Sequence, residues 1–258
     1  MKQLDAEPAA GARTLVVTGG SRGIGAAVAK LAAQRKYAVA VNYAVNEVAA
    51  RRVVDEIRGA GGTATAIRGD VAVDTDVIAL FAEAERTLGP IAALVNNAGI
   101  TGGLSRVENV SADMLQRLLA VNIIGTFLCA REAIRRMSTR LGGQGGAIVN
   151  LSSRASAIGG GGDWVHYAAS KGAVDTFTLG LAREVGSEGI RVNAVSPGLI
   201  ETEIHAAAGD PGRVQRLLAG VPLQRTGTAE EVAETILWLL SNAASYVTGA
   251  VLDVGGGR

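Results

Sequence analysis

The stretch "TLVVTGGSRGIGAAVAKLAAQ" (residues 14–34) has the pattern of a buried strand, a glycine-rich turn and an amphipathic helix. Gly19, Gly23 and Gly25 give the turn a G-x-x-x-G-x-G spacing. Glycines permit a tight turn and a close approach of backbone to pyrophosphate, and the following helix start offers N–H groups to phosphates. This turn therefore favours a dinucleotide site, the alternative being an ordinary connection between a strand and a helix.

Short aliphatic runs alternate with longer helical patterns along the whole chain. Continuously apolar strands are typical of a parallel sheet that is buried on both faces, and the alternation predicts right-handed crossovers. A closed barrel also alternates, but the seven strands and the glycine pattern favour an open sheet. We predict an α/β, doubly wound Rossmann fold with a seven-stranded parallel sheet and helices on both faces. The predicted strands are 14–18, 38–43, 63–69, 93–98, 147–152, 190–196 and 250–254, and the predicted helices are 24–36, 46–59, 74–88, 111–140, 165–187 and 228–241.

The composition limits the class of protein. Hydrophobic residues make up 48% of the 258 residues and charged residues 19%, so the chain can bury a large core. A net charge of +1 without a basic block argues against nucleic-acid binding. No apolar run approaches about 18 residues, so no membrane span is expected. Cys129 is the lone cysteine and no cluster has metal-ligand spacing, so we expect a cytoplasmic protein without disulfide or metal.

We expect a single domain over residues 13–258, because no linker or repeat divides the chain. Residues 1–12 are expected to form a flexible lead that does not resemble a secretory signal. Residues 199–226 combine Gly, Pro and charge after the sixth strand, where ligands bind in an open sheet. That segment is a candidate substrate lid, and His205 within it is a candidate substrate contact.

The end of the second predicted strand bears on the choice of cofactor. NAD sites usually place an acidic residue there for the ribose 2′-hydroxyl, but this strand ends in Asn42, Tyr43 and Ala44. Glu47 comes later and falls in the next predicted helix. Arg22 in the glycine turn can reach a 2′-phosphate. We therefore expect NADP(H) in preference to NAD(H), which stays possible.

Five motifs in order identify a resemblance. After the glycine turn come "NNAG" (96–99), "VNIIGTF" with Asn122, "IVNLSS" with Ser152 and Ser153, "YAASK" (167–171) and "RVNAVSPGLIET" (191–202). Together they resemble the short-chain dehydrogenase/reductase family in its common form of about this length. The stretch 161–178 and the lid are similar to bacterial glucose-dehydrogenase-like members, and the motifs are shared with 3-oxoacyl-acyl-carrier-protein reductases.

The resemblance implies the catalytic residues. Tyr167 becomes the general acid/base, Lys171 its partner and ribose ligand, and Ser153 the group that holds the substrate oxygen. Asn122 is implied to position a water that connects Lys171 to solvent. A free phenol has a pKa near ~10, and a cation within hydrogen-bonding reach lowers it, so the Tyr167–Lys171 spacing of four on a helix is expected to lower the phenol pKa.

The resemblance also implies cofactor contacts along the chain, Tyr167 and Lys171 included. The adenine and its ribose are expected at Asp70, Val71, Asn97, Ala98 and Gly99, although the "NNAG" amides also suit a purely structural role. The nicotinamide is expected beside Pro197, Gly198, Ile200 and Thr202. The other expected contacts are Gly19, Ser21, Arg22, Gly23, Ile24 and Gly25 in the turn, and Asn42 and Tyr43 at the end of the second strand.

The sequence leaves the substrate open. Few fixed charges flank the expected site, so we predict a small or medium neutral carbonyl or alcohol, sugar-like in type, with a 3-oxoacyl-acyl-carrier-protein as the alternative. An NADP-binding sensor without turnover is a remote alternative, because both Tyr167 and Lys171 are present. His166 points about 100° away from Tyr167 on a helix, so no catalytic part is expected for it. Homotetramers are expected from the resemblance, with the two long helices and the C-terminal strand at the interfaces.

Overall fold

The computed structural model describes residues 13–202 and 212–258, without the side chains of 213–215. The expected flexible lead (1–12), His205 and the middle of the expected lid therefore lie outside the described residues.

The seven predicted strands are confirmed and form one parallel sheet. The sheet order is β3-β2-β1-β4-β5-β6-β7, so the chain builds outward from β1 in one direction and then from β4 in the other. This reversal makes a crevice beyond the carboxyl ends of the central strands, where ligands bind in open α/β sheets. The strands are β1 (Arg13–Val17), β2 (Tyr37–Tyr43), β3 (Thr63–Arg68), β4 (Ile91–Asn96), β5 (Gly146–Leu151), β6 (Ile190–Pro197) and β7 (Val251–Val254).

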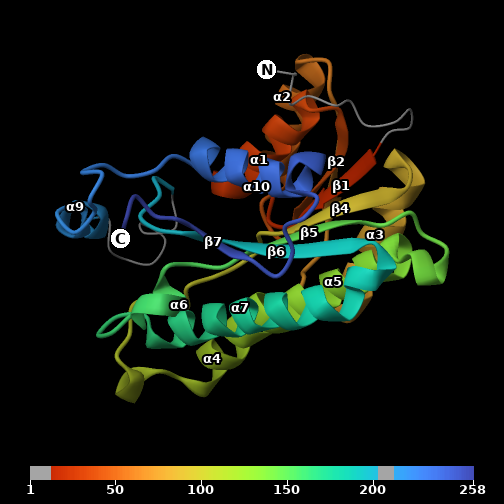
Figure 1. Ribbon diagram of the computed structural model, residues 1–258. Helices are drawn as coiled ribbons and strands as arrows, with labels where there is room; N and C mark the ends of the chain where they lie inside the picture. The colour runs from red at the N-terminus through yellow and green to blue at the C-terminus, as the bar shows by residue number, and fades with distance from the viewer. Residues whose placement is uncertain (1–12, 203–211) are drawn as a thin grey trace.

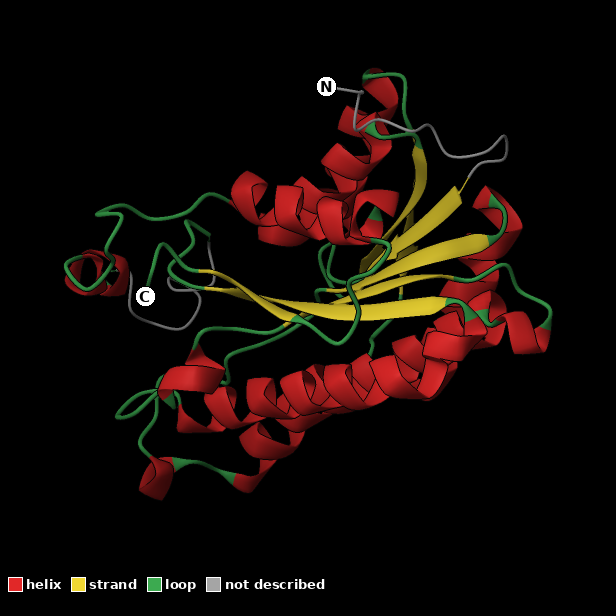
Figure 2. Cartoon of the chain, in the orientation of Figure 1, coloured by secondary structure: helices red, strands yellow, loops and turns green. Residues whose placement is uncertain are grey.

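Helices cover both faces of the sheet (Figure 2). One layer contains α1 (Gly23–Gln34), α2 (Glu47–Gly59) and α10 (Ala229–Leu240), and the other contains α3 (Asp74–Leu88), α5 (Gly125–Met137) and α7 (Val165–Val185). Figure 1 shows α1 and α10 on one side of the sheet and α5 and α7 on the other. Successive residues of β1 serve the two layers: Leu15 and Val17 pack toward α1 and α10, while Val16 packs toward α3 and α5. The continuously apolar strands are thus buried on both faces, as their sequence predicts.

The predicted helix 111–140 is divided into segments. It consists of α4 (Ala112–Leu119), a π-helical turn (Ala120–Ile124) and α5, and a 3-10 turn (Thr139–Leu141) follows. By length and hydropathy alone, Ala112–Met137 also passes for a membrane span. In the fold, however, Cys129, Ala133 and Met137 on α5 lie in the core against the sheet. Two helices too short to show a period, α6 (Ala155–Ile158) and α9 (Arg213–Leu218), were not predicted.

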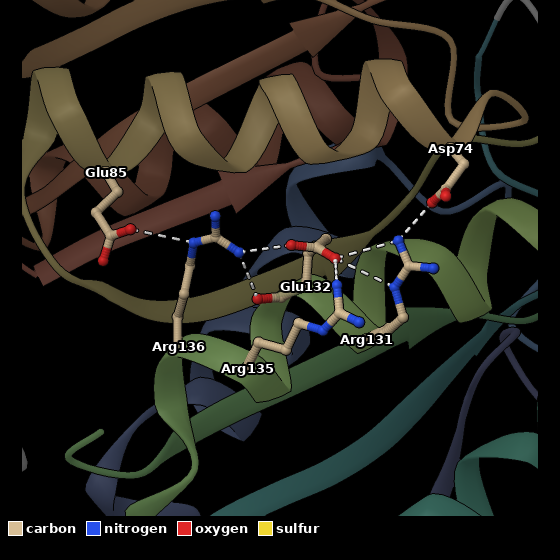
Figure 3. A network of polar contacts seen from close by, with 6 residues as sticks. All are labelled: Asp74, Glu85, Arg131, Glu132, Arg135 and Arg136. Carbon is tan, nitrogen blue, oxygen red and sulfur yellow. Dashed lines mark hydrogen bonds and ion pairs between the residues drawn. The ribbon is translucent and has the colours of Figure 1, made fainter. Parts of the chain in front are cut away.

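An ion-pair cluster fastens α5 to α3 (Figure 3). Glu132 is buried, and its carboxylate accepts hydrogen bonds from Arg135 at 2.7 Å and Arg136 at 2.8 Å. Arg136 also contacts Glu85 on α3 at 3.2 Å, and Arg131 pairs with both Glu132 and Asp74. Burial alone would raise the pKa of Glu132, but the hydrogen bonds and charges of the arginines outweigh it and hold this pKa below the usual value. The carboxylate therefore stays charged inside the protein.

Candidate active site

A cleft opens beyond the carboxyl ends of β4, β5 and β6, at the end of the strands near which α6 and α9 lie (left in Figure 1). It has a volume of about 1040 Å³ including its open mouth and the solvent there. Many of the residues expected at the site line this one cleft: Ile24, Asn97, Gly99, Ser153, Tyr167, Lys171, Pro197, Gly198, Ile200 and Thr202.

The glycine turn has the conformation that its sequence predicts. Gly19 and Gly23 have φ angles of +61° and +51°, which other residues rarely adopt. A Cβ on Gly25 would lie 2.5 Å from both Gly19 O and Asn97 Nδ2, so only glycine lets α1 start this close to the turn. The N-cap residue of α1, Arg22, makes no side-chain capping bond to the first turn of this helix within the described chain. This cradle fits the pyrophosphate of a dinucleotide.

Two amide side chains, those of Asn97 and Asn42, hold the turn in place. Asn97 donates from Nδ2 to Thr18 O at 2.9 Å and Gly19 O at 3.0 Å. Asn42 accepts from Gly19 N at 3.2 Å and donates to Gly69 O at 2.9 Å. The structural role that the sequence left open for the "NNAG" amides is thus present in Asn97, and Asn42 ties the turn to the end of β3.

Several of the expected cofactor contacts lie at the ends of β2 and β3 and at the start of α1. Tyr43 is buried, Val71 packs against Gly125, and Arg22 is exposed at the start of α1, with Ser21 half-buried beside it. Asp70 is partly exposed and accepts a hydrogen bond from Arg117 at 2.8 Å. Because β2 and β3 lie on the far side of β1 from Tyr167, an extended dinucleotide can span from these residues to the cleft.

The expected nicotinamide-side residues follow β6. Gly198 N donates to Val254 O at 2.9 Å, and a Cβ on Gly198 would lie 2.6 Å from Gly255 Cα. The Thr202 side chain lies over Gly23, where a Cβ would be 3.6 Å from Thr202 Cγ2. The segment after β6 thus returns to the glycine turn and closes one side of the cleft.

Tyr167 lies at the base of the cleft on the first turn of α7 and is 8% exposed. Its burial raises the pKa of the phenol, and a hydrogen bond with the Ser153 side chain opposes that rise. Ser152 and Ser153 both line the cleft, and the Ser152 hydroxyl donates to Lys171 O at 3.5 Å. Trp164 packs edge-to-face on the Tyr167 ring, with centroids 5.7 Å apart.

Lys171 lies one turn further along α7 and is also buried. Its Nζ donates to Leu151 O at 2.6 Å and lies 5.8 Å from the centroid of the Tyr167 ring. Burial lowers the pKa of Lys171 to about 8, and the Asp175 carboxylate opposes this shift. The expectation that Lys171 lowers the pKa of Tyr167 is wrong for this arrangement, because the ammonium is directed at a backbone carbonyl and burial dominates the phenol.

Asn122 lies in the π-helical turn between α4 and α5. Its amide accepts from Ile100 N and donates to Ile100 O, both at 2.9 Å, and also donates to Ser170 Oγ at 3.0 Å. A Cβ on Gly99 would lie 3.4 Å from Asn122 Oδ1 and 3.6 Å from Lys171 Nζ, so both polar atoms lie beside Gly99. Such π turns are frequent at functional sites.

The sequence did not predict two features of the site. The carbonyl of Leu151 orients Lys171, but a backbone atom leaves no pattern in a sequence. His166 holds the loop that contains Thr101 and lines the cleft, and this contact was not predicted, because only a catalytic part had been considered for His166. The adjacent glycines at 102 and 103 were the available signal that this loop has an unusual backbone.

Comparisons with known proteins agree with this geometry. A family model described as enoyl-(acyl carrier protein) reductase matches residues 19–258. The uncharacterized oxidoreductase YgfF of Escherichia coli K12 is 54% identical over 243 residues, which cover 94% of this chain and 98% of the relative. The 3-oxoacyl-acyl-carrier-protein reductase FabG of Staphylococcus aureus is 39% identical over 247 residues, which cover 95% and 97%.

One of the similar solved structures contains a bound cofactor. The blue fluorescent protein from a metagenomic library, in complex with NADPH, superimposes with a TM-score of 0.87 at 34% sequence identity. The match covers 95% of this chain and 97% of that protein.

Proposed function

This chain belongs to the short-chain dehydrogenase/reductase family, and we propose that its cleft interconverts a ketone and a secondary alcohol with Tyr167 as general acid/base. The observation that carries the proposal is that Ser153, the buried Tyr167 and the buried Lys171 line one cleft, which adjoins the glycine turn. A phenol and a serine hydroxyl on one substrate oxygen are the donors that carbonyl reduction requires.

The bound nicotinamide supplies or accepts the hydride, and the side chains manage the proton. In reduction, Tyr167 Oη donates its proton to the carbonyl oxygen while Ser153 donates a hydrogen bond to the same oxygen. In oxidation, the same groups work in reverse. The high pKa of Tyr167 keeps the proton on the phenol at neutral pH, which suits the reductive direction.

Lys171 and Asn122 are proposed to resupply that proton. Lys171 has a pKa of about 8, so its ammonium can give up a proton under mildly alkaline conditions. Asn122 Oδ1 and Lys171 Nζ both lie beside Gly99, and this placement supports the expected role of Asn122 in positioning a water. Lys171 also lies where it can bind the ribose hydroxyls of the nicotinamide half.

We propose a preference for NADP(H). Gly20 N donates to Asn42 O at 2.8 Å, which places the glycine turn and Arg22 beside the end of β2, where no carboxylate repels a 2′-phosphate. Arg22→Ala is expected to raise KM for NADPH about tenfold and leave KM for NADH unchanged. A wild-type preference for NADH would contradict this proposal.

The substrate is proposed to be a small or medium neutral carbonyl or sugar-like alcohol. Ile158, Trp164, Leu199 and Leu217 give the outer cleft an apolar lining, and Arg154 is neutralised by Asp253 at 2.5 Å. The 39% identity to a 3-oxoacyl-acyl-carrier-protein reductase supports the alternative of an acyl thioester, whose chain the same apolar side chains can pack against. Leu199 and Leu217 belong to the segment 199–226, which we propose as the lid.

One assay tests these proposals together. Purified protein is incubated with NADPH or NADH and a panel of sugars, diketones, quinones and acetoacetyl thioester, and nicotinamide absorbance is followed. The proposal expects turnover of a neutral carbonyl with NADPH. Faster turnover of the thioester than of any other compound would establish the alternative, and NADPH binding without turnover of any compound would favour the sensor.

We infer a homotetramer in the cytoplasm. Ile124, Phe127 and Leu179 expose apolar surface on the outer layer of α5 and α7, and Tyr246 and Val251 do so beside the edge strand β7. Two such surfaces on different sides suit an assembly with two kinds of interface. Cys129 is a buried free thiol whose pKa is raised to about 12, which suits a reducing compartment. Light scattering tests the assembly, and a monomer would overturn it.

A further inference from the structure

One wall of the cleft is a loop, residues 100–105, that follows β4. Thr101 in this loop is 7% exposed and lines the cleft. Gly102 and Gly103 have φ angles of +77° and +81°, so the backbone turns in a way that places the carbonyls of Thr101 and Gly103 on the same side. A Cβ on Gly102 would lie 2.5 Å from Met114 Sδ and 3.1 Å from Leu118 Cδ1, so the loop packs directly on α4.

His166 binds both of these carbonyls with one nitrogen. Its Nε2 lies 3.0 Å from Thr101 O and 3.2 Å from Gly103 O. Because both partners are acceptors, we assign the proton to Nε2. The ring is 6% exposed, and Nδ1 is buried with no hydrogen-bond partner among the described residues. A buried nitrogen without a partner carries a desolvation cost, so the contact to the loop is the interaction that the histidine is placed to make.

The loop is held at its start, middle and end by the π-helical turn, by α7 and by the segment just before α7. Asn122 binds Ile100 through both backbone atoms, His166 binds the middle, and Ser105 N donates to Asp163 O at 2.9 Å. His166 precedes Tyr167 in α7, so the ring that holds the loop and the phenol share one helical turn. The distance from the Thr101 wall to the Tyr167 hydroxyl is thereby fixed by a single short piece of helix.

We propose that His166 is a positioning residue, which holds the 100–105 loop as a preformed wall for the part of the substrate remote from the reacting oxygen. The proposal rests on the proposed function for its kinetic consequence, but the loop contact itself does not depend on it. A wall that is fixed before binding lowers the ordering cost of substrate binding, so its loss is expected in KM more than in the proton-transfer step. His166 contacts neither Tyr167 Oη nor Ser153 by any hydrogen bond in the described structure.

Two variants separate this role from plain packing. His166→Phe keeps a ring in the same space without the Nε2 donor, whereas His166→Gln places an amide N–H near the same point. A packing role predicts that Phe is tolerated better than Gln, and the positioning role predicts the reverse. Gly102→Ala leaves His166 intact but strains the loop at a positive φ, so it offers an independent way to displace the wall.

Hydrogen exchange of the peptide 100–106, measured by mass spectrometry on the full chain, tests the contact without any substrate. His166→Phe is expected to raise its exchange rate about tenfold and His166→Gln by less than about threefold, while exchange in α1 stays unchanged. Gly102→Ala is expected to match His166→Phe. Equal exchange in wild type and His166→Phe, or equal acceleration by Phe and Gln, would overturn the proposal.

Kinetics with ethyl acetoacetate as the probe test the consequence for the cleft. His166→Phe is expected to raise KM about tenfold with kcat within about threefold, and His166→Gln to restore KM. The dissociation constant for NADPH, followed by fluorescence, is expected to stay the same in all variants. A loss of kcat with unchanged KM would overturn the positioning role. A wild type that oxidises no NADPH with any carbonyl would instead overturn the proposed function, and the exchange experiment would still decide the loop contact.

Discussion

Two helices of this protein bury charged side chains to nearly the same extent and surround them differently. Glu132 on α5 is 3% exposed and Lys171 on α7 is 4% exposed. Glu132 is paired with Arg131, Arg135 and Arg136, and these extend the cluster to α3 (Figure 3). The Lys171 ammonium instead donates to a neutral carbonyl, that of Leu151.

The pKa values follow from this difference. Three guanidinium groups outweigh burial at Glu132 and lower its pKa, so the carboxylate keeps its charge. At Lys171 burial outweighs the single carboxylate of Asp175, and the pKa falls to about 8. A buried charge with a full set of partners, such as that of Glu132, joins helices to each other. A buried charge with few partners, such as that of Lys171, can gain or lose its proton near neutral pH, as a proton-transfer site requires.

The largest expected effect comes from a change at Tyr167, which lies one turn before Lys171 on α7. Tyr167→Phe removes the proposed proton donor and is expected to lower kcat/KM for ethyl acetoacetate with NADPH about 1000-fold. NADPH affinity and the thermal midpoint are expected to hold, because the ring and its contact with Trp164 remain. Tyr37→Phe, on β2 away from the cleft, is the matched control. Wild-type turnover by Tyr167→Phe would disprove the acid/base role.

Glu132→Gln tests the structural charge, because it removes the buried carboxylate that Arg131, Arg135 and Arg136 share. We expect a loss of about 3 kcal/mol in the free energy of unfolding at neutral pH, measured in urea, with kcat unchanged. Because the folded pKa is lowered from 4.5, this stabilisation is present above pH 4.5 and is lost as pH falls through the folded pKa. Glu83→Gln, at an exposed pair with Arg86, should leave stability unchanged. Equal effects of the two variants would mean that burial of Glu132 does not matter.

Lys171→Met is expected to weaken activity and strengthen the fold. We expect kcat to fall about 100-fold, because the proton partner of Tyr167 is lost. In the wild type the folded pKa of about 8 lies below the unfolded value of 10.5, so the unfolded chain binds more protons between these pH values. Wild-type stability should therefore gain about 3 kcal/mol from this group as pH rises through that window, and Lys171→Met should abolish the gain. Parallel stability–pH curves for the two proteins would contradict the lowered pKa.

The smallest expected effect comes from Asp175→Asn. The Asp175 carboxylate raises the pKa of Lys171, so its removal should lower that pKa further. The alkaline limb of the pH–rate profile should move to lower pH by less than about one unit. Glu184→Gln, on an exposed position of the same helix, is the control and should not move the profile. A shift to higher pH would contradict the conclusion that the Asp175 carboxylate raises the pKa of Lys171.

The sheet could be predicted from the sequence, because most strands, such as β1, β2 and β5, are apolar on both faces and the residues themselves carry that information. The long helix 111–140 was predicted as continuous, and its π-helical turn was missed. Nothing in "AVNII" disfavours an α-helix. Asn122 lies in this turn and contacts Ile100, which is remote in sequence, so the irregular turn depends on tertiary contacts.

The candidate site could be predicted as a set of residues but not as a set of interactions. Motif order placed Ser153, Tyr167 and Lys171 in one site, and the structure brings them to one cleft, while their chemical roles stay predictions. The direction of the Tyr167 pKa was wrong, because spacing on a helix does not show where an ammonium is directed or how deeply a phenol is buried. His166 contacts Thr101, which is 65 positions away in the sequence, and this contact could not be predicted from the sequence either.

The pKa of Lys171 is the most direct test of the difference between the two buried charges. It can be measured in the cofactor-free protein by titrating the ¹³Cε signals of labelled lysines, with Lys171→Met identifying the signal. We predict a midpoint near pH 8. A midpoint near the ordinary value of 10.5 would show that the Lys171 charge is as well stabilised as that of Glu132, and would contradict the account of an underpaired catalytic lysine.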